Sequence, residues 1–325
     1  MNAVENSRPI LEIKELCKDF RIRSAKLMGR TRMLHALSDV SLTVYKGETL
    51  GVIGESGCGK STLGRCIVGL HEATSGNILY QGKNVNDANK KMLCREIQMV
   101  FQDPYSSLDS RMTAGRAIEE PLIIHKLERQ REKREAIVLD LMKKVGLDVQ
   151  HFYRYPHEFS GGQRQRINIA RALALNPRMI VCDEPVSALD VSIQAQVLNL
   201  LSDIQSEMGL TYIFISHDLS VIRYISDRIA IMYLGRIVEL CDAAEIYKSP
   251  LHPYTQALLS SVPPASPFER KEFVALKGDI TSPIGEQKGC ALARRCQHCM
   301  QRCREEIPEL KAVSGRHQVA CFLCE

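Results

Sequence analysis

The stretch that decides the fold is GESGCGKST at residues 54–62, which directly follows the apolar run TLGVI at residues 49–53. Its glycines let a backbone wrap closely around phosphate oxygens, and a helix that begins near Lys60 adds the dipole of its N-terminus. Lys60 supplies a cation for the β- and γ-phosphates, and the Ser61 hydroxyl can ligate Mg²⁺. A glycine-rich turn that binds nothing is the alternative, but the flanking strand and helix patterns favour phosphate. The residues expected to contact a nucleotide are Gly54, Glu55, Ser56, Gly57, Cys58, Gly59, Lys60, Ser61 and Thr62.

Around this stretch, short apolar runs that end in turns alternate with longer helical patterns, which predicts an α/β fold. Residues 49–53, 179–182 and 212–215 read as buried strands. Between residues 106 and 175 the pattern changes to helix. Within this segment, residues 126–147 are dense in Lys, Arg and Glu, and they predict a solvated helix. The face of that helix toward the core is predicted to carry Ile137, Leu141 and Val145, which are spaced by four.

The overall composition excludes several classes of protein. The chain has 325 residues, 45% of them hydrophobic and 25% charged, so we expect one large domain with an appendage, or two domains. Its 43 basic and 38 acidic side chains leave a net charge of +5, which is too mild to indicate nucleic acid. The apolar runs are all shorter than ten residues, whereas a membrane-spanning helix needs about 20. The first residues, MNAVENSRPILEIKEL, show no export signal, so we expect a cytosolic chain that meets a membrane only through a partner.

Five further motifs follow the phosphate loop in a fixed order. Gln102 lies in VFQDP, and FSGGQ at residues 159–163 precedes a helical pattern. MIVCDEP at residues 179–185, SALD at residues 187–190 and IFISHD at residues 213–218 complete the set. In this order and spacing, the chain resembles the ATP-binding cassette of ABC transporters over residues 10–250. The resemblance implies a P-loop ABC nucleotide-binding domain, with a RecA-like core and a helical subdomain at about residues 105–175.

The resemblance also implies roles for single residues. Glu184 corresponds to the general base that polarises the attacking water, Gln102 to the sensor of the γ-phosphate and metal, and His217 to the γ-phosphate contact. Asp183 ends a predicted strand, and its hard carboxylate oxygen suits Mg²⁺, so the implied metal contacts are Ser61, Gln102 and Asp183. Phe20 stands where the family places the aromatic ring that stacks on adenine. Ordinary core packing is the alternative for Phe20.

A second phosphate-binding surface is implied by Ser160, Gly161, Gly162 and Gln163, at the start of a predicted helix. In the family, two cassettes dock head to tail, so this surface of one closes on the ATP that the other holds, and Asp190 belongs to the same contact. ATP binding then draws two domains together, and hydrolysis releases them. The motifs exclude a P-loop kinase or GTPase, which would lack SGGQ.

Sequence phrases outside these motifs resemble the ATP-binding subunits of bacterial oligopeptide and dipeptide importers. They include VGLHEATSGNILYQGKNV, RYPHEFSGGQRQRINIARAL and SPLHPYTQALLSSVP. The resemblance implies a second, different ATPase subunit, two transmembrane permeases and an extracytoplasmic substrate-binding protein, at the cytoplasmic face of the bacterial inner membrane and without nucleic acid. The alternatives are the same ATPase role in a nickel or metal-chelate importer, or a soluble ABC ATPase without transport.

The C-terminal part differs from the rest in its cysteines. Residues 250–267 contain five prolines, which break helices and mark a boundary. We expect a cassette over residues 1–255 and a small Cys-rich extension over residues 256–325. Six of the twelve cysteines lie in the last 36 residues, and in a reducing compartment such a cluster favours metal over disulfides. The spacing seen in the tails of this group falls here on Cys290, Cys296, Cys303 and Cys321, as ligands of a [4Fe–4S] cluster or zinc, with free reduced thiols as the alternative.

Overall fold

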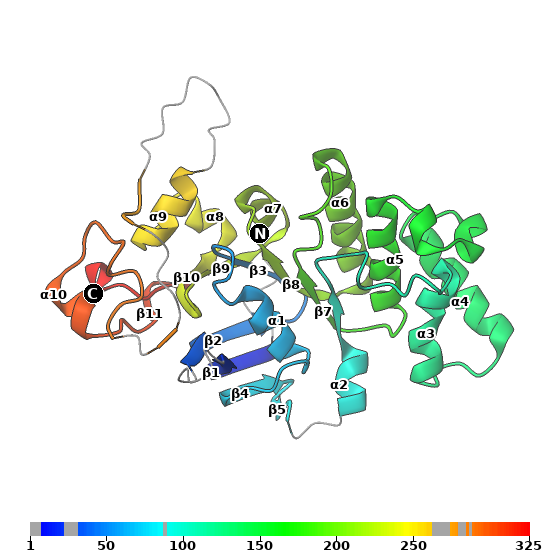
Figure 1. The fold of residues 1–325 in the computed structure, drawn as a ribbon, viewed down its shortest axis with the longest axis horizontal. Helices are drawn as coiled ribbons and strands as arrows, with labels where there is room; N and C mark the ends of the chain where they lie inside the picture. The colour runs from blue at the N-terminus through cyan, green and yellow to red at the C-terminus, as the bar shows by residue number, and fades with distance from the viewer. Residues whose placement is uncertain (1–7, 23–31, 87–89, 262–273, 279–283, 286–287) are drawn as a thin grey trace, which may run out of the picture.

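A computed structural model of the chain describes residues 8–22, 32–86, 90–261, 274–278, 284–285 and 288–325. The molecule has a core of two sheets and a separate group of helices, which lies to the right in Figure 1. The larger sheet has eight strands in the order β11-β12-β10-β9-β3-β8-β7-β6. Its strands are β3 (Thr49–Ile53), β6 (Ile97–Val100), β7 (Met179–Asp183), β8 (Thr211–Ser216), β9 (Arg228–Tyr233), β10 (Arg236–Asp242), β11 (Lys311–Ser314) and β12 (His317–Val319).

The five strands from β9 to β6 run parallel to one another, and every residue of β3 is buried between its two neighbours. Parallel strands end at the same edge of a sheet, and ligands bind beyond that edge in open α/β folds. The phosphate loop follows β3 at this edge, while Glu184 follows β7 and His217 follows β8. The topology therefore brings together three motifs that are far apart in sequence.

A second, antiparallel sheet has the order β2-β1-β4-β5. Helix α1 (Lys60–Ile67) contacts β2 of this sheet as well as β7 and β8 of the larger sheet, so it packs between the two (Figure 1). The strands are β1 (Pro9–Ile22), β2 (Arg32–Tyr45), β4 (Ser75–Tyr80) and β5 (Lys83–Asn84).

The remaining helices cover the larger sheet or form the insert. Helices α3, α4 and α5 contact one another and form the helical insert, which confirms the predicted change to helix (Figure 1). The helices are α2 (Lys90–Glu96), α3 (Ala114–Ile124), α4 (Arg131–Lys144), α5 (Gly161–Leu173), α6 (Val191–Met208), α7 (Leu219–Ile225), α8 (Ala243–Ile246), α9 (Pro253–Ser260) and α10 (Gln301–Glu305). Short 3₁₀ turns cover Val149–Tyr153, Pro156–Glu158 and Phe322–Cys324.

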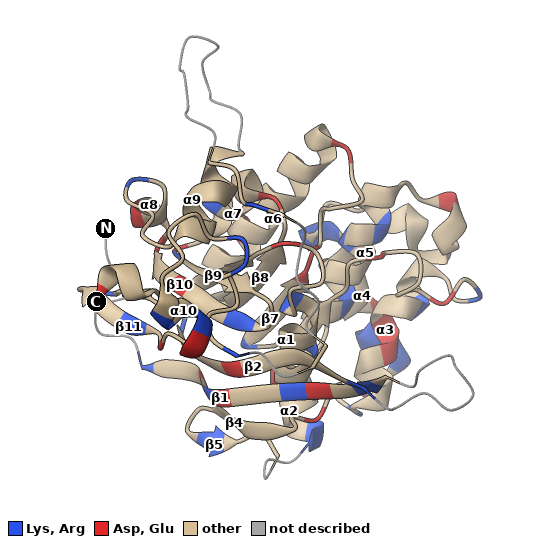
Figure 2. Ribbon diagram, turned by 60° about the vertical axis from the view of Figure 1, so that its left-hand side comes forward, with Lys and Arg blue, Asp and Glu red and all other residues tan. Residues whose placement is uncertain are grey.

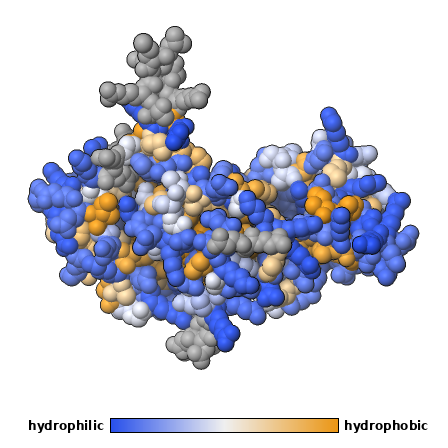
Figure 3. Space-filling model, turned by 90° about the horizontal axis from the view of Figure 1, so that it is seen from below, coloured by the Kyte–Doolittle hydropathy of each residue, from blue (hydrophilic) through white to orange (hydrophobic). Residues whose placement is uncertain are grey.

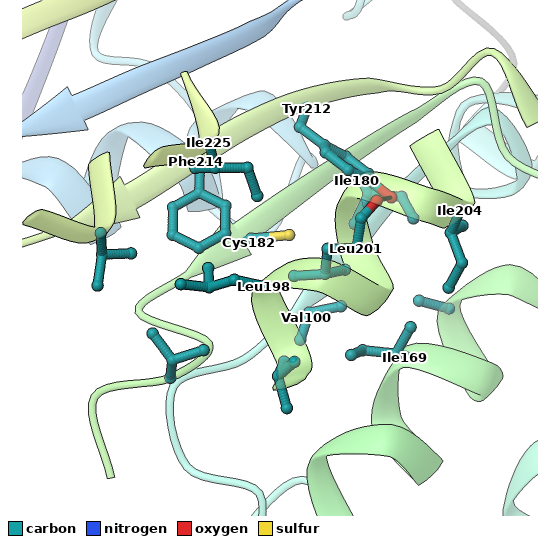
Figure 4. Packing of buried hydrophobic residues seen from close by; sticks show 14 of the residues in the cluster. Val100, Ile169, Ile180, Cys182, Leu198, Leu201, Ile204, Tyr212, Phe214 and Ile225 are labelled. Atoms are coloured by element: carbon teal, nitrogen blue, oxygen red, sulfur yellow. Dashed lines mark hydrogen bonds between the residues drawn. The ribbon is translucent and has the colours of Figure 1, made fainter. Parts of the chain in front are cut away.

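The larger sheet separates two hydrophobic cores because alternate residues of a strand point to opposite faces. Ile180 and Cys182 join the core under α5 and α6, whereas Met179 and Val181 join the core around α1. Figure 4 shows the first of these cores, where the Tyr212 hydroxyl donates to the Leu201 carbonyl at 3.1 Å. Two packed faces explain why the predicted strands are continuous apolar runs rather than alternating ones.

The predicted helix at residues 126–147 forms as α4, but one of its three predicted core positions is wrong. Leu141 and Val145 are buried, whereas Ile137 is 38% exposed. Val138 and Met142 take the remaining core positions. The observed set repeats every three or four residues, which follows the 3.6-residue turn of a helix more closely than a strict spacing of four.

The C-terminal segment is joined to the core through the sheet. β12 pairs with β10 antiparallel, with Glu239 opposite Val319, and β11 then pairs with β12. Strands from the predicted extension therefore complete the edge of the larger sheet. The predicted boundary at residue 255 lies within α9, and it remains a prediction.

Charged residues of both signs are interspersed along the elements, as Figure 2 shows. Seen from below, the surface is largely hydrophilic, with hydrophobic residues in small separate patches (Figure 3). Across the described part of the chain, the helices are all too short or too polar to cross a membrane.

Candidate active site

The phosphate loop, residues 54–59, needs its glycines for two different reasons. Gly57 and Gly59 have φ angles of 78° and 106°, a region that favours glycine. A Cβ at Gly59 would lie 2.3 Å from the Ala36 carbonyl oxygen, and a Cβ at Gly54 would lie 2.1 Å from that of Met232. The loop is therefore shaped by close backbone contacts from β2 and from the end of β9.

Lys60 begins α1 and turns its ammonium group back into the loop. Its Nζ donates to the carbonyl oxygens of Gly54 at 2.7 Å and Glu55 at 3.0 Å, and the residue is only 4% exposed. Cys58 lies beside it, and burial raises the pKa of the Cys58 thiol, so this cysteine is a neutral filler of the loop at pH 7. The ammonium group is thus held against the backbone of the loop.

Asp183 and Ser61 meet across the end of the sheet. The Ser61 Oγ donates to Asp183 Oδ1 at 2.8 Å. Burial raises the pKa of the Asp183 carboxyl, and the hydrogen bond from Ser61 acts in the opposite direction. A hydroxyl and a carboxylate at this distance offer two hard oxygen atoms to one cation, which fits the donor set that Mg²⁺ prefers.

Glu184 contacts the other two predicted catalytic residues, Gln102 and His217. Its Oε2 accepts a hydrogen bond from Gln102 Nε2 at 2.9 Å and lies 3.0 Å from His217 Nδ1. The Glu184 backbone has a φ of 48°, which is unusual for a residue with a side chain, and its N–H donates to the Ile215 carbonyl at 2.9 Å. The carboxylate is mostly buried, with 12% of the side chain exposed, whereas 56% of the His217 side chain is exposed. The structure therefore brings Gln102, Glu184 and His217 together at the open edge of the site.

The predicted second phosphate surface lies apart from the loop. Ser160 caps α5: its Oγ accepts from the Gln163 N–H at 3.3 Å, and the Gln163 side chain accepts from the Ser160 N–H at 3.0 Å. Ser160 is exposed, and Asp190 is exposed at the start of α6. Figure 1 shows α5 in the group of helices at the right, whereas α1 lies between the two sheets. The α5 N-terminus is therefore free to face another molecule.

Phe20 lies on the antiparallel sheet, near the end of β1. Its ring packs edge-on against His71 with the ring centroids 5.4 Å apart, and Lys18 Nζ lies 5.0 Å from the ring centre. The register pairs Phe20 with Leu34, two residues before the Ala36 carbonyl that contacts the loop. The ring is half-buried, and its predicted contact with adenine remains a prediction.

Sequence reasoning missed two residues that touch the phosphate loop. The Glu55 N–H donates to the Tyr254 hydroxyl at 2.9 Å, and Arg295 Nη1 lies 3.0 Å from Glu55 Oε2. They are 199 and 240 residues from Glu55 in sequence, respectively. No local pattern links them to the loop, so only the folded chain reveals the contact.

The four predicted metal-binding thiols line one narrow cavity. Cys290, Cys296, Cys303 and Cys321 all border it, and the Cys290 N–H donates to the Cys303 carbonyl at 2.7 Å. Burial raises the pKa of the Cys290 thiol to about 11 and that of Cys321 to about 12. Within the described ranges, no group of three or more His, Cys, Asp or Glu side chains is arranged to hold a metal ion. The expected metal centre is therefore not confirmed.

Comparisons with known proteins identify the family. A family profile described as "ABC transporter" matches residues 37–187, which include the phosphate loop, Gln102 and Glu184. The oligopeptide transport ATP-binding protein AppF of Bacillus subtilis is 50% identical over 324 residues, covering 98% of each chain. The chain belongs to the ABC transporter family. This confirms the resemblance drawn from the motifs.

Other matches to this ABC protein agree. The dipeptide transport ATP-binding protein DppF of Haemophilus influenzae is 48% identical, covering 99% of this chain and 98% of its own. A profile described as "Oligopeptide/dipeptide transporter, C-terminal region" matches residues 238–303. Among solved structures, the dimeric ATP-binding cassette MJ0796 in a post-hydrolysis state, bound to ADP and Pi, has a TM-score of 0.63 and 30% identity, covering 72% of this chain and 98% of that one. The ABC protein is therefore an ATPase with the predicted P-loop cassette fold.

Proposed function

We propose that this ABC protein is the ATP-hydrolysing subunit of a heteromeric importer for dipeptides or oligopeptides. ATP closes a head-to-tail pair of cassettes, and hydrolysis lets the pair open. The single observation that carries the proposal is the position of the Glu184 carboxylate, between Gln102 and His217 and one residue from the Asp183–Ser61 pair. The relatives AppF and DppF are named for oligopeptide and dipeptide transport, which supports the choice of cargo.

Each residue of the site has a part in this reaction. The backbone N–H groups of residues 57–62 and the Lys60 ammonium would bind the phosphates, and Ser61, Asp183 and Gln102 would hold Mg²⁺. When bound, Mg²⁺ supplies positive charge that offsets the charge developing on the phosphate oxygens. Glu184 orients the attacking water and accepts its proton. Gln102 and His217 both contact Oε2 of Glu184, so Oε1 is the atom that we assign to the water.

The α5 N-terminus supplies the other half of an ATP site. Ser160 is exposed where α5 begins, and the helix dipole favours a phosphate at this position. The loop of the same chain lies elsewhere, so the ligand of this surface is the ATP held by a partner cassette. Asp190, at the exposed start of α6, belongs to the same contact.

The partners that complete the importer are a second, different ATPase subunit, two transmembrane permeases and an extracytoplasmic binding protein. The chain would then work at the cytoplasmic face of the cell membrane. These assignments follow from the peptide-importer resemblance, and the C-terminal profile match supports them. Co-purification with the permeases tests them directly.

We propose that Cys290, Cys296, Cys303 and Cys321 hold a [4Fe–4S] cluster or zinc. Two observations support this proposal: the four cysteines line one cavity, and both centres are commonly bound by four cysteine thiolates. Protein purified without oxygen is analysed for iron, inorganic sulfide and zinc. Iron and sulfide in equal amounts indicate the cluster, zinc alone indicates a zinc site, and the absence of stoichiometric metal leaves reduced thiols.

Uptake by the reconstituted transporter tests the function itself. The complex in liposomes is supplied with Mg-ATP on the side of this subunit, and a panel of peptides is compared with Ni²⁺ and nickel chelates. We expect ATP-dependent uptake of peptides and no uptake by a Glu184→Gln complex. Uptake of nickel but not of peptides would assign the alternative cargo. A subunit that pairs with another cassette but binds no permease would contradict the proposal.

A further inference from the structure

Glu55, the second residue of the phosphate loop, is held from three sides. Its N–H donates to the Tyr254 hydroxyl at 2.9 Å, and its carbonyl accepts from Lys60 Nζ at 3.0 Å. Its carboxylate pairs with Arg295 Nη1, at 3.0 Å through Oε2 and 3.2 Å through Oε1. Tyr254 lies at the end of the predicted cassette, whereas Arg295 lies in the predicted C-terminal extension, so the extension contacts the phosphate loop directly.

The contacts are made by packed side chains rather than by mobile surface groups. Tyr254 is fully buried, and Arg295 is 9% exposed. The rings of Tyr233 and Tyr254 lie 4.6 Å apart, and Arg295 Nη1 donates to the Tyr233 hydroxyl at 3.4 Å. The Arg295 backbone is fixed as well, because its N–H donates to the Leu292 carbonyl at 2.8 Å. The guanidinium group therefore has a defined position beside the loop.

The negative charge of Glu55 explains why the ion pair with Arg295 matters for nucleotide binding. A carboxylate in a loop that binds polyphosphate repels the ligand, and the repulsion grows with the ligand's negative charge. Lys60 cannot neutralise both groups, because its ammonium is needed for the phosphates. Arg295 contacts both carboxylate oxygens of Glu55, whereas Lys60 contacts its carbonyl oxygen, so Arg295 offsets the charge of the Glu55 carboxylate. Because the ion pair is mostly buried, salt screens it less than a surface pair.

We infer that Arg295 is a positioning residue for the ATP site: it neutralises Glu55 and holds that carboxylate back from the phosphates, while Tyr254 fixes the loop backbone. The inference rests on the proposed binding of ATP at the phosphate loop. It makes the C-terminal segment a structural part of the nucleotide site. Arg295 directly precedes Cys296, so the cysteine cavity and the phosphate loop are linked through one residue.

The affinity of the full-length protein for Mg-ATP and Mg-ADP tests the inference. In Arg295→Gln, the Kd for Mg-ATP is expected to rise about tenfold and that for Mg-ADP only about threefold, because the uncompensated carboxylate repels the more negative ligand more strongly. Adding Glu55→Gln to this variant should restore both values to within about twofold of the wild type. The single variant Arg295→Lys should keep most of the wild-type affinity for Mg-ATP, since lysine keeps the positive charge.

Matched variants separate charge from structure. Arg294→Gln changes the net charge equally, in the same turn, at an exposed position, and it should leave both affinities unchanged. Tyr254→Phe removes only the hydroxyl on the Glu55 N–H, so it should weaken Mg-ATP and Mg-ADP by the same factor. If Arg295→Gln fails to fold, the double variant with Glu55→Gln supplies the measurement, and its ratio of ATP to ADP affinity should equal that of the wild type.

Three results would overturn the inference: equal affinities in Arg295→Gln and Arg294→Gln, an equal loss for ATP and ADP in Arg295→Gln, or no rescue by Glu55→Gln. The wild type and Lys60→Ala are titrated alongside. A wild type that binds no Mg-ATP, or a Lys60→Ala variant that binds it normally, contradicts the proposed function instead. The two failures are therefore distinguishable.

Discussion

At the scale of single residues, the site depends on Glu184 and its conformation. The residue has a φ of 48°, which costs energy for a side-chain-bearing residue and persists only where the surroundings impose it. The surroundings do so here: the Ile215 carbonyl binds the backbone N–H, and Gln102 and His217 contact the carboxylate. Strain at this position places the carboxylate beyond the strand end, where the water is expected.

Glu184→Gln tests the role of this carboxylate. The amide keeps the shape of the side chain but accepts a proton far less readily, so we expect turnover to fall by about 10²- to 10⁴-fold. Binding of Mg-ATP should remain within about threefold of the wild type, because the phosphate loop is unchanged. Single-turnover hydrolysis and nucleotide titration measure the two effects. Near-normal hydrolysis would show that another group activates the water.

Asp183→Asn tests the electrostatic cost of burying the Asp183 carboxylate. Burial raises the pKa of Asp183 in the folded state, so ionisation of this carboxyl destabilises the fold, and the cost grows as the pH rises through the folded-state pKa. Asn is neutral at every pH and can still accept the Ser61 hydrogen bond. Without Mg²⁺, we expect the variant to be more stable than the wild type by roughly 1 kcal/mol at neutral pH.

The gain should shrink as the pH falls and disappear below about pH 3, where the wild-type carboxyl is mostly protonated in both states. Thermal unfolding at several pH values, in buffer without nucleotide or Mg²⁺, measures it. The same variant should lose Mg²⁺-dependent turnover. A variant that is less stable than the wild type at neutral pH contradicts this account of Asp183.

At the scale of elements, α5 must both present its N-terminus and pack against α6. Gly162 serves the packing, because a Cβ there would lie 2.4 Å from Ile193 Cγ2. At Gly161 the nearest atom would be Leu189 Cδ2 at 3.3 Å, which a small shift can relieve. Neighbouring glycines of one motif thus have different structural roles.

Gly162→Ala should therefore destabilise the protein by about 1–3 kcal/mol through overpacking. Gly161→Ala is the matched control, and it should change the free energy of unfolding by less than about 0.5 kcal/mol. Denaturant unfolding of both variants measures the difference. Equal stabilities would contradict the close packing of α5 on α6.

Local elements of this fold are largely predictable from the sequence. β3, β7 and β8 follow from continuous apolar runs, and the phosphate loop and α1 follow from glycine spacing and a helical pattern. Ile137 was misassigned because a spacing of four drifts around a helix, and only packing decides which neighbouring residue is buried. The meeting of Gln102, Glu184 and His217 follows from parallel strands ending at one edge.

At the scale of the whole molecule, the contacts that tie the C-terminal segment to the core carry no sequence signal. Arg295 reaches Glu55, and β12 extends the larger sheet. Glu239 joins the same region: its Oε1 lies 2.7 Å from His317 Nε2, both side chains are buried, and its oxygens accept from the Leu251 and His252 N–H groups. Such pairings depend on the assembled fold, so no local pattern could predict them.

Glu239→Ala should destabilise the protein by roughly 3 kcal/mol, because it leaves His317 and two backbone donors buried without their acceptor. Glu309→Ala is the control, since Glu309 is exposed and lies 3.8 Å from Lys311 in a surface ion pair. Unfolding monitored by circular dichroism measures both. If the two variants are equally stable, the buried Glu239 network does not anchor the C-terminal segment.

We expect ATP turnover to require two facing cassettes, because the phosphate loop and the α5 N-terminus of one chain lie apart. The most direct measurement is ATP hydrolysis per chain over a range of protein concentrations, with light scattering recording the molecular mass, before and after addition of the second cassette subunit. We predict almost no turnover while the chain is monomeric and a rise in proportion to the paired fraction. Full turnover per chain by a monomer, unchanged on dilution, would show that one cassette hydrolyses ATP without a partner.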